Sequence, residues 1–220
     1  MNLAVFASGG GSNFQAIAQA ITEEKLDARL SVVVSNVETA GVHERAARIG
    51  IPSHTLNPAT YSDQTGYHAD LLAVLTRYDV DFIALAGYLK KIPTSLIEAF
   101  QNRILNIHPS LLPAFGGKGM YGHHVHEAVL AQGVRWTGAT VHLVDAEYDT
   151  GPIVLQEPVP VRQDDTLKSL AARVLYKEHR IYPEALQLFA TEKVKIIGRK
   201  VEITHPRPHG YSRTPRSGNG

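Results

Sequence analysis

Asn106 and His108 are the first candidates for chemistry in this chain of 220 residues. They lie two residues apart in Asn106-Ile107-His108-Pro109, at the end of a predicted strand. Alternate residues of a strand share one face, so we expect the amide and the imidazole to point the same way. An amide donor beside an imidazole is suited to stabilising an oxyanion and to transferring a proton.

Asp149 is the candidate carboxylate. It precedes Thr150-Gly151-Pro152, a turn sequence that would hold its side chain in place. A carboxylate near an imidazole raises the pKa of the histidine and favours the imidazolium. For the other acids of this segment, Asp145 and Glu147, we favour a solvated turn.

The glycine-rich segment Ser8–Asn13 lies between a predicted strand and a predicted helix. Glycines let a ligand approach the backbone closely, and the start of the helix offers free N–H groups and a positive dipole end to an anion. The segment is not a dinucleotide fingerprint, because Phe14 stands where the third glycine would be, and it is not a P-loop. It predicts phosphate binding; the alternative is a tight turn with Ser12 as helix cap.

Glu178 stands eleven residues after Leu167, on the apolar face of a predicted helix. An unpaired buried carboxylate is costly, so Glu178 should either form a structural salt bridge or bind a ligand.

The histidines of His123-His124-Val125-His126 suggest a metal site at first. Their spacing fits no standard zinc pattern, and we find no acidic ligand close to them in sequence. We therefore expect no metal.

The elements that must position these residues alternate in the first half of the chain. Apolar runs predict strands at 3–7, 30–34, 82–86 and 103–108, separated by helices at 12–23, 41–49, 62–78 and 93–100. This order implies right-handed crossovers and a doubly wound, mostly parallel sheet of the α/β class, Rossmann-like in its N-terminal half.

The second half is predicted to be mixed. We expect helices at 124–132 and 166–190, strands at 139–144 and 153–156, and a hairpin at 194–203. Residues 1–204 would form one domain, with halves at 1–100 and 101–204. Residues 205–220, which hold three Pro, three Gly and three Arg without an acid, are predicted to be disordered.

Composition excludes several classes of protein. The net charge of +1 argues against an electrostatic nucleic-acid binder, and no apolar run approaches the ~20 residues of a membrane helix. The absence of cysteine excludes disulfides, thiol nucleophiles and cysteine-ligated zinc. The N-terminus has no basic segment typical of a signal peptide, so we expect a cytoplasmic protein.

Together these motifs resemble the phosphoribosylglycinamide formyltransferase family, from Met1 to about Ala190. The Asn-x-His-Pro-Ser-Leu-Leu-Pro string with a distant Asp-x-Gly-Pro is specific for folate formyl-transfer proteins, and the Gly-x-Gly-Ser-Asn loop narrows this to the glycinamide enzymes. The segments that carry the resemblance are Ser8–Asn13, Asn106–Pro113, Asp149–Ile153 and Glu178–Pro183.

The resemblance implies formyl transfer from 10-formyltetrahydrofolate, as co-substrate and without a metal, to the amine of 5-phosphoribosylglycinamide in purine biosynthesis. Asn106 and His108 would act on the formyl group, and Asp149 would hold and charge His108. Glu178 would meet the amine, with His142 as a supporting residue. The implied binding residues are Gly11, Ser12 and Asn13 for the phosphate, and Gln64, Tyr88, Leu89, Lys90, Lys91 and Ile92 for the folate.

Three positions depart from the family pattern. The family usually has an arginine where Gln64 stands and commonly one where Lys90 stands. Since Lys90 lacks the bidentate fork of arginine and Gln64 lacks the charge, we expect weaker binding of the glutamate tail of the folate. Gly10 replaces a frequent asparagine.

Two other classes remain as alternatives. One is a formyltetrahydrofolate deformylase-like hydrolase, and the other is a non-catalytic nucleotide-binding protein. Partners are expected to be small molecules, with neither nucleic acid nor membrane, and the chain to be a monomer or homodimer.

Overall fold

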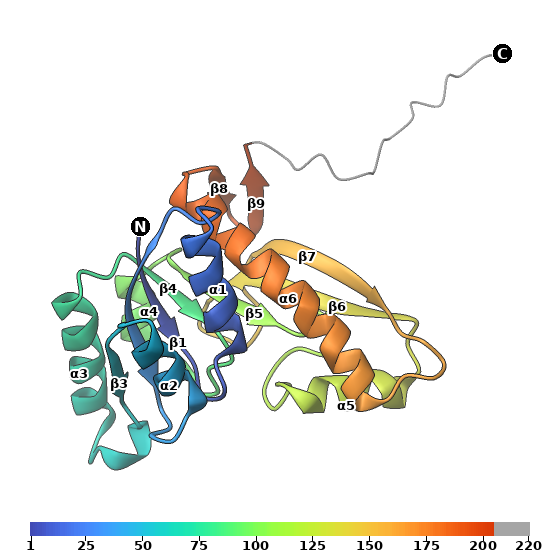
Figure 1. Ribbon diagram of the computed structural model, residues 1–220, viewed down its shortest axis with the longest axis horizontal. Helices are drawn as coiled ribbons and strands as arrows, with labels where there is room; N and C mark the ends of the chain where they lie inside the picture. Colours follow the sequence, from blue (N-terminus) through green and yellow to red (C-terminus); the bar gives the residue numbers. More distant parts are fainter. Residues whose placement is uncertain (205–220) are drawn as a thin grey trace.

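The computed structural model describes residues 1–204, which form a seven-stranded sheet with helices on both faces and a separate two-stranded hairpin (Figure 1). The predicted disordered segment 205–220 lies outside the described residues. The strands of the sheet are β1 (Asn2–Phe6), β2 (Arg29–Ser35), β3 (Ser53–Thr55), β4 (Phe82–Leu85), β5 (Ile104–His108), β6 (Trp136–Leu143) and β7 (Ile153–Pro160). The helices are α1 (Ser12–Thr22), α2 (Gly41–Arg48), η1 (Pro58–Thr60), α3 (Gln64–Arg77), α4 (Thr94–Ala99), α5 (His123–Gln132) and α6 (Leu167–Ala190), and the hairpin is β8 (Val194–Ile197) with β9 (Lys200–Ile203).

Strand direction divides the large sheet into two parts. The strand order is β3-β2-β1-β4-β5-β6-β7. The strands from β3 to β5 pair in parallel, whereas β6 runs antiparallel to β5 and to β7. The predicted α/β class, with a doubly wound, mostly parallel sheet and a mixed second half, is confirmed.

Both faces of β1 are buried, which explains its uninterrupted apolar sequence. Leu3 and Val5 pack into the core beneath α1, α2, α5 and α6. Ala4 and Phe6 point the other way, into the core shared with α3 and α4. The alternation of the strand therefore places helices on both sides of the sheet.

The structure adds elements that the sequence pattern did not predict. β3 and η1 are three residues each, and β3 is made of polar, partly exposed residues at the edge of the sheet, so it has no apolar run to reveal it. β6 begins earlier than expected and β7 ends later. α6 continues through Pro183, as predicted. Within residues 1–204, no helix is both long and apolar enough to cross a membrane.

Tyr182 ties α6 to the strands that carry the site. Its side chain is fully buried, and its hydroxyl hydrogen is shared between the carbonyl oxygens of Leu85 at 2.9 Å and Leu105 at 3.0 Å. These oxygens belong to β4 and β5. One hydroxyl thus links the long helix to two neighbouring strands.

We predict that Tyr182→Phe lowers the free energy of unfolding by about 1–2 kcal/mol, because it removes a buried hydroxyl that donates to two backbone carbonyls. Urea unfolding followed by circular dichroism measures this change. Tyr176→Phe is the control, because that tyrosine lies on the same helix and is 69% exposed. Equal stability of the two variants would contradict the role of Tyr182.

Candidate active site

A cavity of about 890 Å³ opens beyond the carboxyl ends of β4 and β5. Asn106, His108 and Asp149 all line it, so the structure brings together the three residues on which the catalytic prediction depends. Ligands of open parallel sheets bind at this position, and the volume is in the range of small-molecule sites.

Asn106 faces His142 across the antiparallel pair of β5 and β6, where the two residues are direct partners in register. The Nδ2 atom of Asn106 lies 3.1 Å from Nε2 of His142. His142 donates from Nδ1 to the carbonyl oxygen of Leu143 at 2.8 Å. In the neutral ring Nε2 is then the acceptor, so it fixes the orientation of the Asn106 amide.

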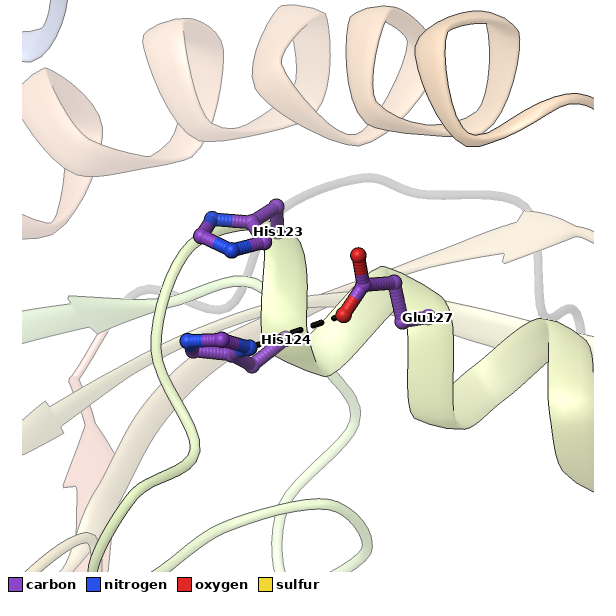
Figure 2. Close-up of side chains that lie close together, drawn as sticks. All are labelled: His123, His124 and Glu127. Atoms are coloured by element: carbon purple, nitrogen blue, oxygen red, sulfur yellow. Dashed lines mark ion pairs between the residues drawn. The ribbon is translucent and has the colours of Figure 1, made fainter.

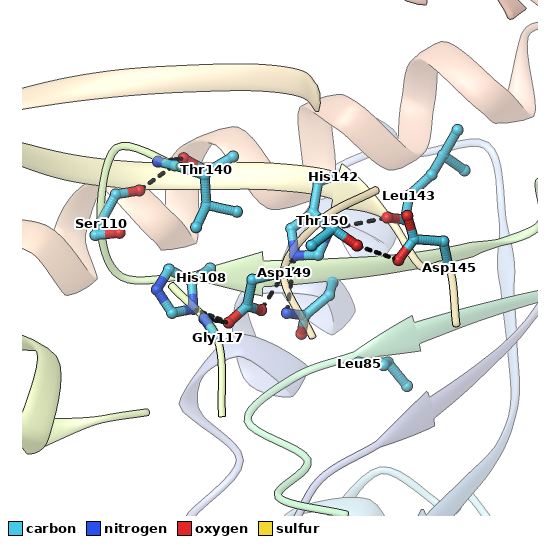
Figure 3. Close-up of polar contacts among 12 residues, drawn as sticks. Leu85, His108, Ser110, Gly117, Thr140, His142, Leu143, Asp145, Asp149 and Thr150 are labelled. Carbon is cyan, nitrogen blue, oxygen red and sulfur yellow. Dashed lines mark hydrogen bonds and ion pairs between the residues drawn. The ribbon is translucent and has the colours of Figure 1, made fainter. Parts of the chain in front are cut away.

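Asp149 lies between two imidazoles (Figure 3). Its Oδ2 is 3.6 Å from Nδ1 of His108, and its Oδ1 is 3.6 Å from Nε2 of His142. The backbone N–H of Gly117 donates to Oδ2 at 2.9 Å. The turn that follows Asp149 packs closely against the end of β6, because a Cβ atom on Gly151 would lie 1.7 Å from the carbonyl oxygen of Leu143. Gly151 therefore lets the Asp149 turn lie directly against the end of β6.

The surroundings of Asp149 favour its charged form. Burial would raise its pKa, but the neighbouring His142 and His108 and the N–H of Gly117 together outweigh burial. The pKa of Asp149 is therefore lower than that of an ordinary aspartate, and the carboxylate is ionised at neutral pH.

His108 departs from the expected protonation state. Burial lowers its pKa and outweighs the Asp149 charge and the Phe115 carbonyl, which both raise it. The expectation that the carboxylate leaves His108 charged is therefore wrong for this structure, in which the neutral imidazole is favoured. Its Nε2 donates to the carbonyl oxygen of Phe115 at 2.8 Å, so Nδ1 is the nitrogen that faces Asp149 and can take up a proton.

The predicted phosphate loop ends in Gly11, which has φ +73° and is the N-cap of α1 without a side-chain cap. A Cβ atom there would lie 2.9 Å from Val42, so both backbone conformation and space require glycine. Ser12 is the first helical residue rather than the cap. The N–H groups at the start of α1 are thus left without a capping side chain.

Glu178 is buried and lines the same cavity. Its Oε2 accepts a hydrogen bond from Nδ2 of Asn13 at 2.7 Å, and within residues 1–204 no cation pairs with it. Burial raises the pKa of Glu178, and the bond from Asn13 offsets this only in part. The structural salt bridge considered from sequence is not present among these residues, which leaves a carboxyl group facing the cavity without a positive partner.

Known proteins are similar to this chain in both sequence and fold. The family described as formyl transferase matches residues 1–186. The chain belongs to the formyl transferase family. A phosphoribosylglycinamide formyltransferase of Bacillus subtilis is 40% identical over 84% of this chain and 92% of its own length. The crystal structure of a glycinamide ribonucleotide transformylase from Symbiobacterium toebii has a TM-score of 0.87 and 44% identity, with 92% of this chain and 93% of that chain covered.

These comparisons confirm the resemblance to the phosphoribosylglycinamide formyltransferases. A chloroplastic protein of that name from Vigna unguiculata is 49% identical over 87% of this chain. The chain spans 62% of the length of that relative.

The folate-binding residues expected of this formyl transferase divide into two groups. Tyr88, Leu89, Lys90, Lys91 and Ile92 all line the large cavity, in the segment that follows β4. The remaining residue, Gln64, is exposed at the first position of α3 and is not among the residues that line the cavity. The structure therefore does not place Gln64 with the predicted folate contacts.

An acidic residue, Glu127, stands beside the histidine cluster at the start of α5. His123, His124 and Glu127 place one ligand atom each within 4.8 Å of the others, and all three are exposed (Figure 2). Nδ1 of His124 lies 3.5 Å from a carboxylate oxygen of Glu127. The expectation that no acidic ligand stands close to these histidines is wrong, whereas the absence of a metal stays a prediction.

Two backbone groups of the site could not be found from sequence. The carbonyl of Phe115 and the N–H of Gly117 belong to the loop between β5 and α5, and they contact His108 and Asp149. Their positions depend on the loop conformation, because any residue type supplies the same groups. The only sequence signal was the richness of the loop in glycine and proline.

We predict that Asp149→Asn lowers the pKa of His108 further, because it removes the negative charge that opposes the effect of burial. The pH titration of the His108 ring by nuclear magnetic resonance measures this. The matched control is Asp145→Asn, in the same segment, whose carboxylate accepts hydrogen bonds from Glu147 and Thr150 instead. An unchanged or higher His108 pKa in Asp149→Asn would contradict the pairing.

Proposed function

We propose that this chain transfers a formyl group from 10-formyltetrahydrofolate to the amine of 5-phosphoribosylglycinamide, a step of purine biosynthesis. The observation that carries the proposal is the cluster of Asn106, His108 and Asp149 in the wall of one cavity of about 890 Å³. The names of the relatives that cover most of this chain support the choice of substrates.

The cavity offers separate places for the reacting groups. Glu178 is a carboxyl group without a cationic partner among the described residues, and it suits the amino end of the glycinamide. The segment 88–92 lines the part of the cavity that we assign to the folate. Of the predicted phosphate-binding residues Gly11, Ser12 and Asn13, only Asn13 lines this cavity. The open N-terminus of α1 that they form suits the ribose phosphate.

The chemistry follows from the protonation states. As the amine nitrogen attacks the formyl carbon, its proton passes to the neutral His108, and the carbonyl oxygen becomes an oxyanion. The amide of Asn106 and the imidazolium then stabilise that charge, and preorganised donors of this kind contribute roughly 3–4 kcal/mol each. Asp149 stabilises the imidazolium from 3.6 Å. As the carbon–nitrogen bond to the folate breaks, the proton moves from His108 to the leaving nitrogen.

His108 has to change one contact for this to happen. In the structure its Nε2–H is bound to the carbonyl of Phe115. For Nε2 to accept the proton of the amine, the neutral ring must leave this carbonyl and carry its own hydrogen on Nδ1, which faces Asp149 at 3.6 Å. The loop between β5 and α5, which holds Phe115, therefore gives up this contact during the reaction.

The remaining expectations stay predictions. These are formyl folate as a co-substrate without a metal, small-molecule partners only, a monomer or homodimer, the domain halves 1–100 and 101–204, and a cytoplasmic location.

A single assay separates the proposal from its alternatives. The protein is incubated with 10-formyltetrahydrofolate, with and without phosphoribosylglycinamide, and the release of tetrahydrofolate is followed by absorbance. Product only in the presence of the amine supports the transferase. Product without the amine indicates a hydrolase, and no product in either case indicates a non-catalytic binding protein.

We predict that His108→Ala and Asp149→Asn each lower kcat by at least about 100-fold, because general acid–base catalysis contributes about that much or more. Steady-state kinetics with both substrates measures the effect, and circular dichroism checks the fold. His124→Ala and Asp145→Asn are the controls: His124 does not line the cavity, and the Asp145 carboxylate is bound within its own turn. Turnover of His108→Ala or Asp149→Asn at the rate of the unaltered protein would refute the proposed mechanism.

A further inference from the structure

Ser8, the first residue of the glycine-rich segment, contacts the segment that follows β4. It lies two residues after the end of β1 and is buried. Its backbone N–H donates to the carbonyl oxygen of Gly87 at 3.0 Å, and its hydroxyl accepts from the N–H of Leu89 at 2.9 Å. Gly87 and Leu89 line the catalytic cavity, whereas Ser8 is not among the residues that line it. Ser8 therefore supports part of the cavity wall from outside the cavity.

Asn36 fixes the direction of the Ser8 hydroxyl. It follows β2 directly and is buried. The hydroxyl donates its single hydrogen to Oδ1 of Asn36, so its lone pairs are left to accept from the N–H of Leu89. The donor and acceptor roles of the hydroxyl are thus both used. One side chain connects the end of β2 with the segment that follows β4.

The backbone at Leu89 needs this support because it has left the sheet. Gly87 has φ +77°, a left-handed conformation that turns the chain away from β4 and favours glycine. Leu89 lies four residues beyond the end of β4, so its N–H has no acceptor in the strand pairing and binds the Ser8 hydroxyl instead. Loss of that hydroxyl would leave the N–H without its partner.

Tyr88, between these two contacts, anchors the same segment in the core. Its ring packs edge-on against Phe6, with 5.3 Å between the ring centroids, and its hydroxyl lies 3.0 Å from that of Tyr67 on α3. The side chain of Leu89, by contrast, is 52% exposed. The backbone of residues 87–89 is therefore fixed, while the Leu89 side chain in the cavity wall is free to contact a ligand.

The rest of the glycine-rich segment is attached to α2 rather than to the segment after β4. The carbonyl of Gly9 accepts from the N–H of Val42 at 3.1 Å, and the carbonyl of Gly10 accepts from Nε of Arg45 at 2.6 Å. Both partners belong to α2. These contacts do not involve the Ser8 hydroxyl, so its removal should act on the segment after β4 and leave the start of α1 in place.

We propose that Ser8 is a positioning residue for the formyl folate, because its hydroxyl holds the backbone of Leu89 in the wall of the cavity. The proposal rests on the proposed function, which assigns the segment 88–92 to the folate. It departs from the expectation that the whole segment Ser8–Asn13 serves the phosphate. The two roles differ in kinetics: the first acts on the KM for the folate, and the second on the KM for phosphoribosylglycinamide.

Steady-state kinetics of Ser8→Ala tests this assignment. The KM for 10-formyltetrahydrofolate should rise about 3- to 10-fold, the range that one neutral hydrogen bond contributes. The KM for phosphoribosylglycinamide and the kcat should stay within about 2-fold. Ser31→Ala is the matched control, because this buried serine of β2 has a hydroxyl without a hydrogen-bond partner among residues 1–204. An unchanged KM for the folate, or a rise in the other KM instead, would overturn the proposal.

Asn36→Ala tests the connection from the other end. It keeps the Ser8 hydroxyl and removes the acceptor that orients it, so it should raise the same KM by a smaller factor. In the double variant of Ser8→Ala and Asn36→Ala, the KM should equal that of Ser8→Ala, because both residues act through one hydroxyl. Multiplication of the two single effects in the double variant would show that Asn36 does not act through Ser8, which contradicts the proposal.

Calorimetry with tetrahydrofolate separates this proposal from the proposed function, because binding of the product requires no transfer. Weaker binding by Ser8→Ala than by the unaltered protein and Ser31→Ala supports the positioning role. Such binding in a protein that transfers no formyl group would refute the proposed function and leave the positioning role standing. Formyl transfer together with equal folate binding by Ser8→Ala and the unaltered protein would overturn the positioning role alone.

Discussion

The buried charge of Asp149 is the constraint on which the site depends. A carboxylate removed from water costs several kcal/mol unless hydrogen bonds and opposite charges compensate for it. Here the compensation comes from His142 on β6, His108 on β5 and the N–H of Gly117 in the loop between them. Because these groups come from three segments, the carboxylate is stable only when both strands and the loop are in place.

The change of strand direction between β5 and β6 makes this arrangement possible. In an antiparallel pair, residues directly opposite each other come close enough for their side chains to interact. Asn106 and His142 are such a pair, and Thr140 lies opposite His108. The hydroxyl of Thr140 donates to the carbonyl of Ser110 at 2.6 Å and accepts from the N–H of Leu112 at 3.1 Å. The same strand therefore orients the amide and secures the start of the loop that supplies the backbone contacts.

Local patterns in the sequence predicted the elements and the pair on β5, because the period of a strand decides which side chains share a face. Effects of tertiary packing could not be read in this way. The lowered pKa of His108 depends on how deeply the folded chain buries the ring. The place of Gln64 depends on how α3 lies relative to the cavity. The contact of Glu127 with His124 is local by contrast, because residues three apart on a helix are neighbours. The edge strand β3 has only three residues and no apolar run to predict it.

Neighbouring residues of a helix point about 100° apart, so one helix can present different chemistry to the catalytic cavity and to a second cavity, of about 670 Å³, between α1, α2 and α6. In α1 this separates Ser12 from Asn13, and in α6 it separates His179 from Glu178. The hydrogen bond between Asn13 and Glu178 joins α1 to α6 on the side that faces the catalytic cavity.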